Sequence, residues 1–105
     1  MSRRLIIRDE AEADITKAAV WYDGREPGLG LEFTHEVGAA IQRALNNPEL
    51  HLQLREIPEI HRILTRRFPY RVFFILRPDA MVVFAVLHAA RHDHHWQSRA
   101  QRSHD

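Results

Sequence analysis

Two apolar runs separated by only three residues limit most strongly what this chain can fold into. They are residues 72–76 (VFFIL) and 80–87 (AMVVFAVL). Each run is apolar on successive residues, which is typical of central strands that are covered on both faces. Pro78-Asp79, between the runs, is a turn signal. The sequence therefore predicts strands at 70–77 and 81–88 that form an antiparallel hairpin.

Two segments with helical spacing precede this hairpin. The first has apolar residues at helical intervals and predicts a helix over 10–24, with Asp9 as its N-cap. Glu26-Pro27-Gly28-Leu29-Gly30 breaks that helix. A second amphipathic segment follows and ends at Asn46-Asn47-Pro48. Gly38 inside it is unfavourable for a helix, which predicts that it marks close packing between the two helices.

Two further strands are predicted, at 3–8 and at 61–68. Residues 49–60 contain Pro58, which favours a loop or a short edge segment. The order strand, two helices, three strands indicates an α+β domain (β-α-α-β-β-β), with a helical hairpin packed on a small, curved, mostly antiparallel sheet. We expect one domain over residues 1–105 and a frayed tail over about 97–105.

The composition excludes several classes of protein. Hydrophobic residues make up 45% and charged residues 28% of the 105, as in a soluble globular domain rather than a disordered chain. No apolar run reaches the length of a membrane span, and the N-terminus lacks the features of a signal peptide. Cysteine is absent, so thiolate ligands and disulfides are excluded. We therefore expect a cytoplasmic protein without a membrane partner.

Charge is divided unevenly along the chain. Residues 1–54 carry a balance of −3 and residues 55–105 a balance of +4. Arg62, Arg66, Arg67 and Arg71 flank a chain reversal at residues 68–70, so several guanidiniums are predicted to converge near one end of the sheet. Arginine holds phosphate or carboxylate oxygens in a bidentate fashion. The alternative is that these arginines form salt bridges with the acidic helices.

Histidine provides the other candidate chemistry, and four of these residues lie near the end of the chain: His88, His92, His94 and His95. The spacing His-x₃-His occurs in zinc sites, usually on a helix. Here it lies at the end of a strand, so no metal is expected. His88 ends a buried strand near Arg91, where an imidazole can act as a general base. The alternative is a capping histidine that is hydrogen-bonded to the backbone.

The aromatic residues leave a similar choice open. Trp21 and Tyr22 lie on the first predicted helix and Trp96 lies in the tail. An aromatic ring beside arginines can stack on a nucleic-acid base. The alternative is that these rings close a core, which we favour for Tyr22, and that Trp96 pins the tail onto the sheet.

The whole pattern resembles the RelE/ParE superfamily of toxins from type II toxin–antitoxin systems, and its ParE-like branch in particular. The matching segments cover nearly the whole chain in order: Ala13-Asp14-Ile15, Trp21-Tyr22, Pro27-Gly28-Leu29-Gly30, Phe33, residues 67–74 (RFPYRVFF), residues 86–91 (VLHAAR), Trp96 and Arg99. The order of strands and helices in this superfamily agrees with the order predicted above.

The resemblance implies two possible activities. RelE-like members cut messenger RNA on the ribosome without a metal or other cofactor. The resemblance to these members places a basic functional face at Arg62, Arg66, Arg67, Tyr70, Arg71, Arg91 and Trp96. It also makes four residues the candidate catalytic residues: Arg62, Arg71, His88 and Arg91. The lysines that several nucleases of this type use are absent, because Lys17 is the single lysine. Arginine, with a pKa above about 12, is a poor general base.

ParE-like members lack this nuclease set and inhibit DNA gyrase. The resemblance therefore implies a toxin of the plasmid-stabilisation type that inhibits gyrase, is neutralised by a cognate antitoxin and is not an enzyme. Two alternatives stay open. One is a ribosome-dependent mRNA endonuclease, and the other is an inactive toxin fold that is kept for binding a partner.

Overall fold

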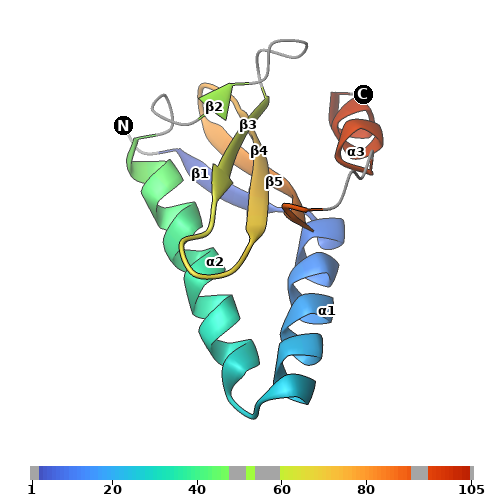
Figure 1. Ribbon diagram of the computed structural model, residues 1–105. Helices are drawn as coiled ribbons and strands as arrows, with labels where there is room; N and C mark the ends of the chain where they lie inside the picture. Colours follow the sequence, from blue (N-terminus) through green and yellow to red (C-terminus); the bar gives the residue numbers. More distant parts are fainter. Residues whose placement is uncertain (1–2, 48–51, 54–59, 91–94, 105) are drawn as a thin grey trace.

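The computed structural model describes residues 3–47, 52–53, 60–90 and 95–104. Its elements are β1 (Arg4–Ile7), α1 (Asp9–Arg25), α2 (Leu29–Asn46), β2 (Leu52–Gln53), β3 (Ile60–Leu64), β4 (Tyr70–Leu76), β5 (Ala80–His88) and α3 (His95–His104). The strands form one sheet in the order β1-β5-β4-β3-β2, in which β1 is parallel to β5 and the other pairs are antiparallel. Figure 1 shows the α1–α2 hairpin against this sheet, with α3 away from that hairpin. The predicted fold class is confirmed.

The sheet is covered on both faces, as its uninterrupted apolar strands predict. Val72 and Phe74 of β4 pack into the core with Phe33 and Val37 of α2; we call this side of the sheet the helix face. Alternate residues of β4, Phe73 and Ile75, pack on the opposite side, which we call the outer face, in a second cluster with Trp96 and Ala100 of α3. The central hairpin therefore contributes to two cores at once.

A β-bulge in β5 determines which of its residues reach each face. Phe73 pairs with Ala85 but Phe74 pairs with Val83, so Phe84 is an extra residue in β5. Phe84 and Ala85 consequently both belong to the outer cluster, whereas Val83 and Val86 belong to the helix-face core. A bulge shifts the alternation of side chains by one residue. His88 is therefore on the helix face.

The connection between α1 and α2 depends on a glycine other than the predicted one. A Cβ at Gly30 would lie 2.4 Å from the carbonyl oxygen of Ala19, whereas one at Gly38 would meet nothing within 4 Å. The Oδ1 atom of Asp23 accepts hydrogen bonds from the amides of Gly28 (3.2 Å) and Gly30 (2.8 Å) and holds the turn. The prediction that Gly38 marks the close helix contact is wrong, because Gly38 lies on the exposed side of α2.

The start of α1 and the C-terminal segment also differ from the sequence prediction. The N-cap of α1 is Arg8, without a side-chain hydrogen bond, so the prediction of Asp9 as N-cap is wrong; Asp9 is the first helical residue. The tail that was expected to fray beyond Trp96 contains α3, whose Ala100 is buried. The Trp96 ring stacks on Phe73 with centroids 5.4 Å apart, so an apolar contact orders this polar segment.

No helix in the described ranges is long and apolar enough to cross a membrane.

Replacing Gly30 by alanine should destabilise the fold, because the new methyl group would meet the Ala19 carbonyl. We expect a loss of about 1–3 kcal/mol in the free energy of unfolding, as for overpacked sites. Gly38→Ala is the matched control, since it adds a methyl group in open space inside the same helix. It should stabilise the protein by about 0.5–1 kcal/mol. Urea unfolding of both variants followed by circular dichroism measures this, and equal effects would contradict the assignment.

Candidate functional site

Arg62 and Arg71 are brought together on the outer face. Arg62 of β3 is opposite Phe73, and Arg71 of β4 is opposite Leu64, so the two arginines are diagonal neighbours on adjacent strands. Neither has an acidic partner among the described residues. Burial and the charge of Arg71 lower the pKa of Arg62, although a guanidinium stays charged at neutral pH. Two neighbouring guanidiniums can bind an anionic group such as a phosphate or a carboxylate.

Arg66 and Arg67 lie apart from this pair, in the loop that connects β3 to β4. The buried ring of Phe68 turns the loop inward, and the amide of Tyr70 donates to the carbonyl of Phe68 at 2.8 Å. Arg67 forms an ion pair with Glu32 of α2, with Nη1 and Oε1 3.2 Å apart. Arg66 is exposed and has no partner within the ranges that the structure describes. The salt-bridge alternative is thus confirmed for Arg67.

His88 does not join the arginines. It is opposite Tyr70 in the β4–β5 pair, and the two rings make an edge contact at 5.3 Å on the helix face. Its Nδ1 atom accepts a hydrogen bond from the amide of Ala90 at 3.1 Å. This is the capping arrangement that the sequence left open. Because Arg71 is on the outer face, the sheet separates it from the imidazole.

The other predicted site residues are also divided. Tyr70 is on the helix face, where its ring packs against Tyr22 and Phe33. Trp96 is on the outer face, stacked on Phe73, the cross-strand partner of Arg62. Arg91, with His92 and His94, lies outside the described residues. The part of the chain that is described holds no group of three side chains able to bind a metal ion.

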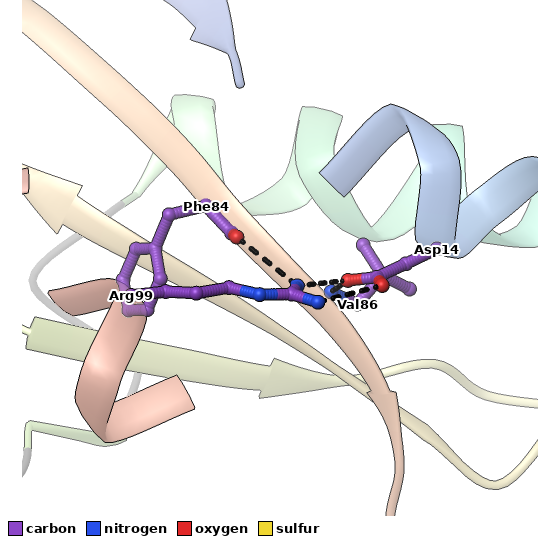
Figure 2. A network of polar contacts seen from close by, with 4 residues as sticks. All are labelled: Asp14, Phe84, Val86 and Arg99. Carbon is purple, nitrogen blue, oxygen red and sulfur yellow. Dashed lines mark hydrogen bonds and ion pairs between the residues drawn. The ribbon is translucent and has the colours of Figure 1, made fainter. Parts of the chain in front are cut away.

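A buried ion pair joins α1, β5 and α3 (Figure 2). The Oδ2 atom of Asp14 accepts from the amide of Val86 (2.9 Å) and from Nη1 of Arg99 (2.5 Å), and Oδ1 accepts from Nη2 (3.2 Å). Nη1 of Arg99 also lies 3.5 Å from the carbonyl oxygen of Phe84. The side chains of Asp14 and Arg99 are only 14% and 16% exposed. Sequence reasoning from residue spacing missed this pair, because 85 positions separate its members.

A concave region lies beside this ion pair, between α1 and the end of β5. The pocket has a volume of about 880 Å³. We call it the α1–β5 groove and define it by Lys17, Val20, Trp21, Tyr70, Leu87 and His88. The sequence offered one signal for it, since Val20 and Trp21 are apolar neighbours on a helix that can bury only one of its faces.

A protein-family model described as "ParE toxin of type II toxin-antitoxin system, parDE" matches residues 5–93. The chain belongs to the ParE toxin family. This family is the branch that the sequence resemblance indicated, and the match covers α1, α2, β2 to β5 and all of β1 except Arg4.

Solved toxin structures share the fold of this ParE-family chain. The chromosomal ParDE TA system from P. aeruginosa gives a TM-score of 0.73 at 13% identity, covering 83% of this chain and 96% of that chain. A mutant of E. coli toxin RelE in the free state gives 0.63 at 18% identity, covering 97% and 98%. The mutant in complex with an antitoxin RelBc peptide gives 0.60 at 19% identity, covering 93% and 95%. No curated protein matches the sequence.

Removing the Asp14 carboxylate should strongly destabilise this ParE-family protein. Asp14→Ala leaves the Arg99 guanidinium and the Val86 amide without their buried acceptor, and we expect a loss of about 3 kcal/mol or more in the free energy of unfolding. Glu32→Ala is the matched control, because it breaks the half-exposed pair with Arg67 and should cost less than about 1 kcal/mol. Chemical denaturation of both variants measures the difference. Similar losses would show that the Asp14 pair has no special role.

Proposed function

We propose that this chain, as a type II toxin of the ParE family, inhibits DNA gyrase and is neutralised by a cognate antitoxin. The family match over residues 5–93 is the observation that carries the proposal. An antitoxin partner is supported further by the E. coli RelE structure in complex with an antitoxin peptide, which has the same fold.

The chemistry of the outer face also favours binding over RNA cleavage. Cutting RNA at the ribose 2′-hydroxyl requires a group that takes up a proton near neutral pH. On β3 and β4 the outer face presents Arg62 and Arg71 as its ionisable side chains, and arginine does not release a proton readily. His88 is on the other face and Lys17 is on α1. The arginine pair is therefore better suited to holding an anionic partner than to general-base catalysis.

The second candidate is the ribosome-dependent mRNA endonuclease. The observation in its favour is the pair Arg62 and Arg71, which has the charge needed to stabilise a phosphorane and lacks an acidic partner in the described ranges. An inactive toxin fold that only binds a partner is the third possibility, and a chain that is harmless without any antitoxin would favour it.

Pulse-labelling after sudden induction of the chain in bacteria tests the target. If gyrase is inhibited, DNA synthesis should fall within the first minutes while protein synthesis continues, because gyrase is needed ahead of replication forks. Labelled thymidine and labelled methionine measure the two processes separately in the same culture. Protein synthesis that collapses first would overturn the gyrase proposal.

Purified components distinguish the two activities at the molecular level. We expect the wild-type chain to block the supercoiling of relaxed plasmid by gyrase and to leave messenger RNA intact on programmed ribosomes. The endonuclease alternative predicts the opposite, and it also predicts that Arg71→Ala and His88→Ala each abolish cleavage while antitoxin binding persists. Cleaved messenger RNA together with normal supercoiling would establish that alternative.

A further inference from the structure

We propose that an extended, acidic segment of the antitoxin binds in the α1–β5 groove as an added strand along the open edge of β5. This inference rests on the proposed function, since it names where and how the antitoxin binds. The groove offers three features that such a segment would contact: backbone groups on a strand edge, an exposed apolar wall and positive charge.

The open edge exists because β1 is much shorter than β5. The β1–β5 pairing ends at Ile7 opposite Val83, and the amide of Arg8 makes the last hydrogen bond to the carbonyl of Val83. Beyond this point no described strand lies beside β5. Asp14 accepts from the amide of Val86, and Arg99 lies 3.5 Å from the carbonyl of Phe84, so these two side chains cover only the first part of the edge.

The next groups on this edge face the groove. The amide of Ala89 donates to the carbonyl of Pro69 at 2.7 Å, toward β4, whereas the amide of Val86 points the other way, to Asp14. Backbone groups alternate in direction along an antiparallel strand. The amide of His88 and the carbonyl of Val86 therefore point away from β4, into the groove. They are one donor and one acceptor placed as a neighbouring strand would need them.

The wall of the groove on α1 is apolar and exposed. Val20 is 68% exposed and Trp21 is 56% exposed. The Trp21 ring is held in place by an edge contact with Tyr22 at 5.0 Å and by the Arg25 guanidinium, 5.0 Å from the ring centroid. Large exposed apolar side chains that line a pocket are typical of a binding surface. An apolar side chain of the added strand would cover this wall.

The charge of the groove selects an acidic partner. Lys17 is on the same side of α1 as Trp21, four residues away, and lines the pocket. Asp14, the acidic residue of the lining, is already paired with Arg99, and Arg25 adds a positive charge over Trp21. The described lining therefore has unbalanced positive charge, which attracts carboxylates. A second copy that docked through its own groove would bring the same charge and be repelled.

Substitutions in the groove, compared with matched substitutions outside it, test the proposal. The probe is the protein encoded by the reading frame adjacent to that of this chain, and calorimetry of the two purified proteins measures the Kd. Trp21→Ala should weaken binding by about tenfold or more, as for a central aromatic contact. Lys17→Glu should weaken it by about threefold or more, and the loss should shrink at high salt. Leu31→Ala on α2, also exposed and outside the groove, is the control and should stay within about twofold.

Hydrogen exchange tests the added strand itself. In the complex the amide of His88 should exchange at least about tenfold more slowly than in the free toxin, because it gains a hydrogen bond that is absent in the free state. The amide of Ala89, already bonded to Pro69, is the internal reference for the free toxin. A helix that docks on Trp21 without adding a strand would leave the exchange of His88 unchanged, and this result would overturn the proposal.

The outcomes separate the inference from the function on which it rests. If the adjacent protein does not bind the wild-type chain, the proposed antitoxin pairing fails. If it binds and suppresses toxicity while Trp21→Ala and Lys17→Glu bind as tightly as wild type, the pairing stands and the groove assignment is wrong. Both side chains are exposed, and far-ultraviolet circular dichroism checks that the variants remain folded.

Discussion

The Asp14 carboxylate does for β5 what a neighbouring strand would otherwise do. β1 ends opposite Val83, so the backbone of β5 beyond it has no partner strand among the described residues, and a buried amide without an acceptor is costly. Asp14 accepts from the Val86 amide and binds Arg99, which fixes α1 beside β5 and holds α3 on the other side. The Asp14 side chain is only 14% exposed, so its carboxylate needs the Arg99 guanidinium to neutralise its charge. In turn, β5 needs this carboxylate as the acceptor for its Val86 amide. The Asp14–Arg99 pair thereby connects α1, on the helix face of the sheet, to α3 on the outer face.

The bulge at Phe84 determines the chemistry that is possible on each face. One extra residue puts Phe84 and Ala85 in the same cluster and returns His88 to the helix face. If the same residues formed a regular strand without the bulge, strict alternation from Val83 would place His88 on the outer face, the side of Arg71. With the bulge, the imidazole packs on Tyr70 and accepts from a backbone amide. The bulge at Phe84 thus keeps the imidazole of His88 apart from the guanidiniums of Arg62 and Arg71.

Much of the fold was predictable because its signals are local. The two apolar runs, the Pro78-Asp79 turn and the helical spacing of residues 10–24 each specify their element within one stretch of chain. The remainder depends on contacts between distant parts. Gly30 rather than Gly38 marks the helix contact, since only the crossing geometry brings Ala19 against it. The Asp14–Arg99 pair spans 85 positions, α3 is ordered by Trp96 on Phe73, and no residue type marks the bulge. The same limit applies to the site: Arg62 and Arg71 were predicted to converge, but the face of His88 was not predictable.

The arginines around Phe68-Pro69-Tyr70 show why a cluster in the sequence is not a cluster in space. Phe68 is buried in the core, so the residue before it turns toward α2, where Arg67 meets Glu32. Arg71 follows Tyr70 in a strand, where successive side chains alternate, and so it reaches the outer face beside Arg62. Besides Arg66, positive charge without an acidic partner in the described ranges lies on this outer pair and on Lys17 in the α1–β5 groove. Because the sheet lies between them, a segment bound in the groove leaves the outer pair uncovered. An antitoxin that binds only there would neutralise the toxin through α1 and the edge of β5 rather than by blocking the arginines.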